Sequence, residues 1–310
     1  MPTISIIIPC FNEGLVIPQL IERLNKIVLK LEHHAYEVIF IDDGSSDATF
    51  ALLAKYQSTH SWIKVLGFAR NFGHQVAVSA GIDHAIGDAT IIMDADLQDP
   101  PEVVLEMIQK WQEGYDVVYG VREQRVGESW FKLLTAKYFY RLLQNVSEIT
   151  IPLDSGDFRL LSRRVVDLIK KMPEQDRFLR GMVAWVGFKQ FGLRYVRDKR
   201  YAGDTKYPLK KMIAFALDGI LSFSKKPLRI ASFFGGLFIM GSLVALCVVL
   251  LFGLLFQCWS SGIVLILIAM FFIGGIQLLC LGILGEYLGR LYSQSKNRPL
   301  YVIGEKLGFD

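Results

Sequence analysis

No charged side chain occurs between Arg229 and Glu286, and this feature most limits the folds open to the chain. Two apolar runs, residues 230–256 and 263–285, fill the interval on either side of a short polar segment. Each run exceeds the roughly 20 residues that a helix needs to cross the hydrocarbon core of a membrane. The pattern predicts a hairpin of two transmembrane helices, 230–256 and 263–289. The alternative is a helical hairpin buried in a soluble core.

Positive charge lies on both outer flanks of these runs and is absent from the turn between them. Under the positive-inside rule, this places the preceding domain, residues 1–205, and the tail, residues 290–310, in the cytosol. The connecting segment, residues 206–229, is a basic amphipathic stretch that suits an anionic membrane surface or a phosphate ligand. Nucleic acid is not the expected partner, because no nucleic-acid motif accompanies the charge. No signal-peptide pattern precedes the first strand-like run, and the four cysteines show neither metal-ligand spacing nor a disulfide framework.

The first 121 residues alternate between strand-like and helix-like patterns. Continuous apolar runs indicate strands buried on both faces, and spacings of three and four indicate helices between them. The expected strands are residues 4–9, 37–41, 63–68, 89–93 and 116–121. The expected helices are residues 17–31, one that follows Asp47, residues 75–86, and one that starts at Pro101. This order predicts an α/β domain with a doubly wound, mainly parallel sheet, in which ligands bind beyond the carboxyl ends of the strands.

Two aspartates, Asp94 and Asp96, follow the fourth expected strand directly. Residues i and i+2 of a strand point to the same side, so the two carboxylates are expected to lie together. Adjacent carboxylates both stay ionised when a cation lies between them, and Mg²⁺ or Mn²⁺ can also bridge to phosphate oxygens. The sequence therefore favours a metal site. A pair of solvated or helix-capping aspartates is the alternative.

Polar and aromatic residues follow the first three strands as well. Phe11, Asn12 and Glu13 follow strand one, while Asp42 and Asp43 follow strand two, a combination that suits a nucleobase and ribose. Ordinary turn chemistry is the alternative. After strand three, Arg70 and the start of a helix favour an anion, and His74 is interpreted as structural.

Two further clusters lie later in the chain. In residues 154–159, a glycine between polar residues allows close approach to a ligand, and Asp157 is a candidate base or ordering group that Arg159 could pair with. The alternative is a hairpin turn. In residues 200–207, Arg200 and Lys206 could grip a phosphate at the membrane interface, and a solvated positive flank is the alternative.

Together these segments resemble the family-2 glycosyltransferases with a GT-A fold. Within that family they are most similar to polyprenyl-phosphate glycosyltransferases such as bactoprenol glucosyltransferases and dolichyl-phosphate mannose synthases. The matching stretches are residues 5–13, 42–47, 70–73, 93–101, 155–159 and 200–207, with Thr205 where serine is commoner.

The resemblance implies inverting, metal-dependent transfer of a hexose from a UDP-sugar to the phosphate of undecaprenyl phosphate in the bacterial plasma membrane. Glucose is the implied sugar; mannose, galactose and modified sugars stay open. It also implies a homo-oligomer. The implied donor-binding residues are Pro9, Phe11, Asn12, Glu13, Asp42, Asp43, Arg70 and Asp94. The implied metal ligands are Asp96, Asp94 and Gln98, and the implied phosphate-facing residues are Arg122, Arg125, Arg200 and Lys206.

Asp157 would lie near the reacting centre, beside Asp94 and Asp96. A phosphate monoester has a second pKa of about 6, so this acceptor is mostly ionised at neutral pH. We therefore expect Asp157 to position groups more than to remove a proton. The competing interpretations are a processive polysaccharide synthase, which needs more membrane helices, and a non-enzymatic membrane scaffold or flippase subunit.

Overall fold

The computed structural model describes residues 1–31, 34–122, 155–198 and 262–309, together with isolated positions between 231 and 255. Within these residues the chain forms an eight-stranded sheet in the order β7-β5-β6-β4-β1-β2-β3-β8. The strands are β1 (Thr3–Cys10), β2 (Ala35–Asp42), β3 (Ile63–Phe68), β4 (Ala89–Ile92), β5 (Val117–Arg122), β6 (Ser155–Ser162), β7 (Gln190–Tyr195) and β8 (Ile303–Leu307). Strands β6 and β8 run antiparallel to their neighbours and the other pairings are parallel. The mainly parallel sheet predicted from the sequence is confirmed.

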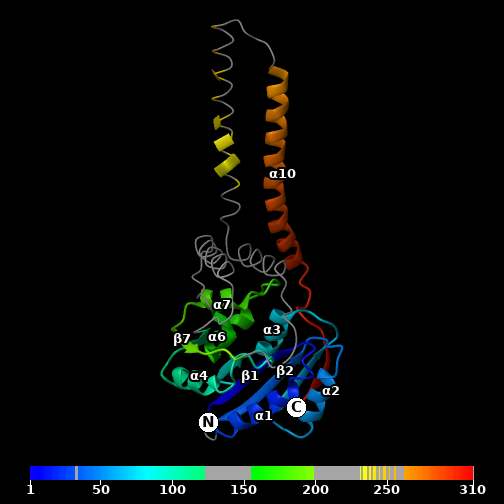
Figure 1. Cartoon of the computed structure of the whole chain (residues 1–310), viewed down its shortest axis with the longest axis vertical. Helices are drawn as coiled ribbons and strands as arrows, with labels where there is room; N and C mark the ends of the chain where they lie inside the picture. The colour runs from blue at the N-terminus through cyan, green and yellow to red at the C-terminus, as the bar shows by residue number, and fades with distance from the viewer. Residues whose placement is uncertain are drawn as a thin grey trace.

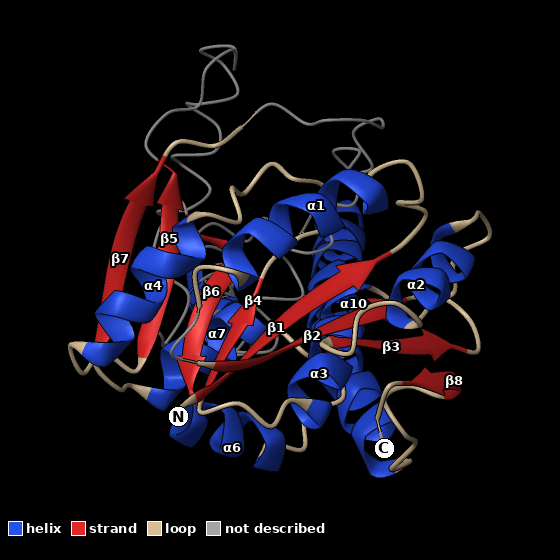
Figure 2. Ribbon diagram, turned by 90° about the horizontal axis from the view of Figure 1, so that it is seen from below, coloured by secondary structure: helices blue, strands red, loops and turns tan. Residues whose placement is uncertain are grey.

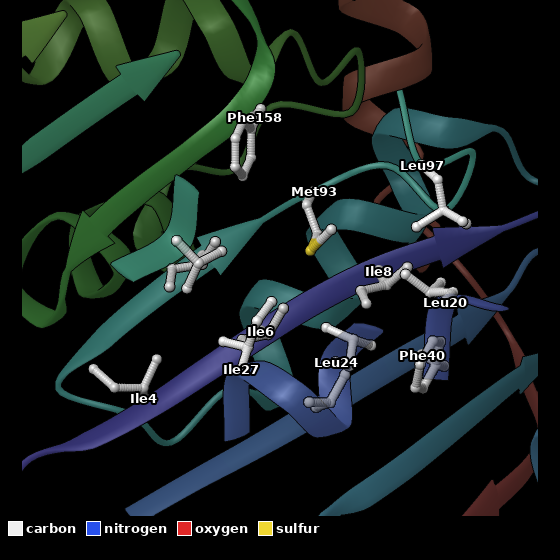
Figure 3. Close-up of a cluster of buried hydrophobic side chains, with 14 of the residues drawn as sticks. Ile4, Ile6, Ile8, Leu20, Leu24, Ile27, Phe40, Met93, Leu97 and Phe158 are labelled. Carbon is white, nitrogen blue, oxygen red and sulfur yellow. The ribbon is translucent and has the colours of Figure 1, made fainter. Parts of the chain in front are cut away.

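Helices cover both faces of the sheet (Figure 2). One face carries α1 (Ile17–Val28), α2 (Thr49–Gln57) and α4 (Val103–Gln112), and the other carries α3 (His74–His84), α6 (Arg163–Lys171) and α7 (Leu179–Val186). The alternation of side chains along a strand explains this double layer. Ile4, Ile6 and Ile8 of β1 pack against α1, as Figure 3 shows, whereas Ile7 belongs to the core on the opposite face.

The antiparallel strand β6 lies between β4 and β5, where the sequence pattern gave no strand. Its first residues are those of the cluster at 154–159, for which the sequence left open a ligand-binding loop or a hairpin turn. Because β6 runs opposite to β4, its first residues lie beside the end of β4. This arrangement brings Asp157 to the same sheet edge as Asp94.

The chain ends on the sheet rather than away from it. Residues 303–307, part of the segment predicted as a cytosolic tail, form β8 and pair with β3. Tyr301 stacks on Phe68 with ring centroids 5.3 Å apart, and its hydroxyl donates to Oδ2 of Asp83 at 3.0 Å. The tail is therefore part of the folded domain.

Helix α10 (Gly262–Ser295) extends away from the sheet (Figure 1). Among the described residues, one helical stretch, Phe272–Ser295, is long and apolar enough to cross a membrane. Its large apolar side chains, such as Leu278, Leu281 and Leu291, are 60–72% exposed, unlike those of a core helix. The predicted first membrane helix is described only at isolated positions, so the two-helix hairpin stays a prediction.

The C-terminal end of α10 contacts the domain. Nη1 of Arg290 lies 3.2 Å from Oδ2 of Asp176, and Oε1 of Gln294 accepts a hydrogen bond from the backbone N–H of Gln175. These contacts, with β8 beyond them, fix where the helix leaves the domain.

Candidate active site at the carboxyl ends of the parallel strands

Three parallel strands end side by side at the edge where the sequence predicts the site. In the register of the sheet Cys10 lies opposite Asp42, and Ile7 lies opposite Ile92. The pairing continues past the strand ends, since the N–H of Asp43 donates to the carbonyl of Cys10 and the N–H of Met93 donates to that of Ile7. The segments after β1, β2 and β4 therefore meet at one place.

The segment after β1 is held to the segment after β2. Oδ1 of Asn12 accepts a hydrogen bond from the N–H of Ser46 at 2.9 Å, and the N–H of Asn12 donates to Oγ of Ser45. The backbone of Asn12 is left-handed, with φ of 55°, which asparagine tolerates better than most residues. Asn12 thus joins the segments after β1 and β2, and Phe11 beside it is 37% exposed.

Asp42 and Asp43 are both buried, but their carboxylates have different hydrogen-bond partners. The carboxylate of Asp43 accepts the backbone N–H groups of Phe72 at 2.7 Å and Gly73 at 2.9 Å, so it anchors the loop after β3. Oδ2 of Asp42 accepts the N–H of Ser45, but its Oδ1 is buried without a hydrogen-bond partner in the described part of the chain. Burial raises the pKa of both carboxyls. The unpartnered oxygen of Asp42 suits a donor group of a bound ligand.

The loop after β3 lies against the loop after β2. Gly44 has a left-handed φ of 68°, and a Cβ added there would lie 2.5 Å from the carbonyl carbon of Arg70. Only glycine fits this contact. The guanidinium of Arg70 lies 4.0 Å from the ring centroid of Phe72 and donates to the carbonyl of Asn71. Arg70 is exposed at the rim of the site.

Strand β4 ends at Ile92, so Asp94 and Asp96 follow it as expected, and the strand alternation assumed for the pair lies beyond the strand itself. Their environments differ. The side chain of Asp94 is 30% exposed, whereas Asp96 is buried and its Oδ1 accepts the N–H of Gln98 at 3.1 Å. Leu97, which lies between Asp96 and Gln98, has a left-handed φ of 58°. The two carboxylates therefore differ in exposure and in hydrogen bonding.

Asp94 and Asp157 lie near each other beyond the end of the β4–β6 pairing. Ile92 pairs with Arg159 in antiparallel register, so two further residues set Asp94 opposite Asp157. His74, the first residue of α3, lies between them. Its Nε2 is 3.7 Å from Oδ1 of Asp94 and 3.4 Å from Oδ2 of Asp157. His74 thus links the two carboxylates that the strands bring together.

This arrangement shifts the protonation of all three groups. Burial raises the pKa of Asp94 to about 6, although the charge of His74 opposes it. Burial lowers the pKa of His74, but the hydrogen bond to Asp157 and the charges of both aspartates outweigh it and raise that pKa to about 9. At neutral pH, His74 is therefore a cation between two acidic side chains.

Arg180 of α7 is the main partner of Asp157. Its Nε donates to Oδ1 at 2.7 Å, and Nε2 of Gln75 donates to Oδ2 at 3.2 Å. Burial would raise the pKa of Asp157, but Arg180 and His74 outweigh it and hold that pKa well below its ordinary value. Arg159, the suggested partner of Asp157, is buried and its Nη2 donates to the carbonyl of Gly156, while the charge of Asp157 acts on it and opposes the lowering of its pKa by burial.

The residues present fit a divalent cation that takes few of its ligands from the protein. The described residues contain no group of three or more His, Cys, Asp or Glu side chains placed to hold a metal ion. Mg²⁺, however, is commonly bound by one or two carboxylates together with substrate phosphates. Asp96 and Asp94 match that pattern, with Gln98 beside them.

Some predicted site residues lie outside the described part of the chain. They are Arg125, Arg200 and Lys206, and of Arg122 only the backbone, at the end of β5, is described. Conversely, sequence reasoning missed Arg180 and the part played by His74. Arg180 has no local signal, because its partner lies 23 residues away on another element. His74 did have a local signal, because it lies at the start of a predicted helix, directly after the loop that follows β3.

Comparisons with known proteins show the family of the chain. The family model described as "Glycosyl transferase family 2" matches residues 5–169. The "Uncharacterized glycosyltransferase YkcC" of Bacillus subtilis (strain 168) is 46% identical over 306 residues, 99% of this chain and 94% of that protein. The "Bactoprenol glucosyl transferase" of Shigella phage SfV is 40% identical over 300 residues, 97% of each.

Among solved structures, S. aureus TarS 1-349 in complex with UDP-GlcNAc superposes with a TM-score of 0.48 at 19% identity, over 71% of this chain and 66% of that one. The family model covers more than half of the chain, and the relatives match nearly all of it. The chain therefore belongs to glycosyl transferase family 2 and is a glycosyltransferase built on a GT-A-like mixed α/β sheet.

Proposed function

We propose that this enzyme transfers a hexose, glucose in the first instance, from a UDP-sugar to the phosphate of undecaprenyl phosphate, with inversion at the anomeric carbon. The observation that carries the proposal is the engagement of Asp157 by Arg180, Gln75 and His74. A carboxylate held in this way is a poor base, and an ionised phosphate acceptor does not need one. Relatives named bactoprenol glucosyl transferase support this class of acceptor.

The donor side is formed by the ends of β1, β2 and β4. In the proposal Phe11 stacks on the uracil ring, and Pro9, Asn12 and Glu13 shape the wall behind it. The unpartnered Oδ1 of Asp42 accepts a hydrogen bond from the nucleoside, while Asp43 holds the loop that carries Arg70. Asp94 serves the nucleotide side of the metal region.

Asp96, Asp94 and Gln98 would hold Mg²⁺ or Mn²⁺ together with the diphosphate of the donor. When bound, it neutralises the charge that develops on the departing diphosphate. The chain's own residues do the rest. Asp157, fixed by Arg180, keeps His74 in place beside Asp94, and the positive charge of His74 limits the repulsion between the two aspartates.

The acceptor oxygen attacks the anomeric carbon from the side opposite UDP, which inverts the configuration. The basic residues Arg122, Arg125, Arg200 and Lys206 receive the acceptor phosphate in this proposal. The lipid tail stays in the bilayer, and α10, with the predicted helix at 230–256, holds the domain at that surface. Such anchoring raises the local concentration of both reactants. The domain and both termini face the cytosol, and the membrane helices associate as a homo-oligomer.

A donor screen tests the proposal. Purified full-length protein is incubated with undecaprenyl phosphate, Mn²⁺ and UDP-glucose, UDP-galactose, GDP-mannose or other nucleotide sugars, and the lipid product is analysed by mass spectrometry. We expect one hexose per lipid, with UDP-glucose giving the highest kcat/KM. A polymeric product would support a processive synthase instead, and transfer to a hydroxyl acceptor but not to the lipid phosphate would refute the acceptor assignment.

A further inference from the structure

A buried aspartate lies at the end of the loop that carries Asp94 and Asp96, and the proposed chemistry does not use it. Asp99 has no exposed surface. Burying a carboxylate is costly unless it is paired and hydrogen-bonded. Its partners come from the end of β7, far away in the sequence. The hydroxyl of Tyr195 donates to Oδ1 of Asp99 at 2.5 Å, and Nε of Arg197 lies 3.4 Å from the same oxygen.

The backbone adds another attachment between the same two segments. The N–H of Asp198 donates to the carbonyl of Gln98 at 2.9 Å. Arg23 of α1 reinforces it from the side, because its guanidinium bonds Glu102 and lies 3.6 Å from Oδ2 of Asp198. The loop is therefore fastened immediately after its last predicted metal ligand.

The loop needs such an attachment because part of it is strained. Leu97 has a left-handed φ of 58°, a conformation that is unfavourable for a non-glycine residue. Leu97 is also buried in the core below the loop. A strained residue between Asp96 and Gln98 persists only where its surroundings hold it. Asp99 and its partners supply that restraint on the carboxyl side.

Tyr195 carries the restraint to the opposite side of the site. Its ring packs edge-on against Phe158, with centroids 5.6 Å apart, and Phe158 directly follows Asp157. One buried tyrosine thus contacts both the loop of Asp96 and the strand of Asp157.

We propose that Asp99 is a positioning residue, held by Tyr195 and Arg197, that fixes the direction in which the Asp94–Asp96 loop presents its carboxylates to the donor. The inference rests on the proposed function for the identity of that donor. Two polar atoms of the Asp99–Arg197 pair make no hydrogen bond in the described part of the chain. They are Oδ2 of Asp99 and Nε of Arg197, and both are buried.

The chain offers a matched control at the other edge of the sheet. Asp116, just before β5, is also buried, accepts a hydrogen bond from Oγ of Ser162 at 3.0 Å, and pairs with Arg164. It has the same kinds of partner as Asp99, a hydroxyl and an arginine, but lies away from the site. Arg164→Met therefore reports the cost of breaking such a pair without affecting the loop.

The test uses full-length Arg197→Met, Tyr195→Phe and Arg164→Met in detergent. Hydrogen–deuterium exchange of the peptide spanning residues 93–100 is measured without metal, and the affinity for UDP with Mn²⁺ is measured by calorimetry. We expect faster exchange and an affinity about tenfold weaker in Arg197→Met, with a smaller change in Tyr195→Phe. Arg164→Met should match the wild type in both measurements.

Wild-type exchange and wild-type UDP affinity in both Arg197→Met and Tyr195→Phe would overturn the role of Asp99. Tyr195→Phe removes one hydroxyl only, so it keeps the test valid if Arg197→Met folds poorly. Metal-dependent UDP binding that is absent even in the wild type would instead refute the proposed function. The exchange measurement judges the restraint separately, because it needs neither nucleotide nor metal.

Discussion

Arg180 grips the carboxylate of Asp157 with two hydrogen bonds, from Nε to Oδ1 at 2.7 Å and from Nη2 to Oδ2 at 3.2 Å. The two residues lie on different elements, α7 and β6, and meet beside Asp94. A carboxylate in such a fork keeps its charge and its orientation. Asp157 held in this way can order the site, but it is a poor acceptor for a proton.

Asp157→Asn should retain measurable transfer activity. The pKa of Asp157 lies well below its ordinary range, so the group is already ionised and does not titrate near neutral pH. The rate should fall because the charge partner of Arg180 is lost, yet the shape of the kcat/KM profile between about pH 6 and pH 9 should not change. Total loss of transfer in Asp157→Asn, with nucleotide binding intact, would instead favour Asp157 as a true base.

Asp96→Ala should abolish transfer at every practical concentration of Mg²⁺ or Mn²⁺. Asp96 is buried beside Gln98, and the described residues contain no group of three or more His, Cys, Asp or Glu side chains that could hold the ion in its place. Initial rates over a metal titration measure the effect. Asp167→Ala, at an exposed position on α6, is the control and should behave as the wild type. Near-normal turnover in Asp96→Ala would refute the metal assignment.

His74 should make stability depend on pH in metal-free protein. Its pKa is raised from 6.5 to about 9 in the fold. A histidine whose pKa is raised on folding stabilises the protein fully below its unfolded pKa, and the contribution is lost as the pH rises through the folded pKa. The Tm advantage of wild type over His74→Gln should therefore be largest below about pH 6.5 and shrink toward pH 9. It is measured by thermal unfolding in chelator.

The groups around His74 set the sign of this effect. Asp94 and Asp157 favour the charged imidazole, and Arg180 opposes it. A Tm difference that stays constant from about pH 6 to pH 10 would mean that His74 does not gain its charge on folding.

Gly44→Ala should weaken both the fold and nucleotide binding. Alanine would be strained at φ of 68°, and its Cβ would lie 2.5 Å from the backbone of Arg70, so the loops after β2 and β3 would have to separate. Gly114→Ala is the control, because Gly114 also has a positive φ, 93°, but its Cβ would meet nothing within 4 Å. Both variants should lose about 1 kcal/mol or more of stability from backbone strain. Only Gly44→Ala should lose UDP affinity in calorimetry.

Tyr301→Ala should destabilise the whole domain although Tyr301 lies near the C-terminus. The ring of Tyr301 stacks on Phe68 of β3. The residue comes just before β8, which pairs with β3 and covers the outer edge of that strand. Loss of the ring should cost about 2 kcal/mol and promote aggregation through the uncovered edge. Tyr301→Phe keeps the ring and loses only the hydrogen bond to Asp83, so its Tm should stay near that of the wild type. Equal Tm values for wild type and Tyr301→Ala would show that the tail does not support the sheet.

The sequence by itself determined the features that depend on neighbours along the chain. Apolar runs and helical spacing are local, so β1 to β5, the helices between them and the apolar run of α10 could be read directly. The same patterns placed Asp42, Asp43, Asp94 and Asp96 at one sheet edge, since parallel strands end together.

Only the tertiary structure decided which polar groups meet. The antiparallel entry of β6 set Asp157 opposite Asp94, α7 supplied Arg180, and β7 supplied the partners of Asp99. The tertiary structure also gives the neighbouring aspartates different partners. Asp43 accepts the backbone N–H groups of the next loop, whereas one oxygen of Asp42 has no hydrogen-bond partner among the described residues. The physical reason is that a buried charge takes its partners from whichever elements pack around it. Those elements lie tens of residues apart, beyond the reach of any local pattern.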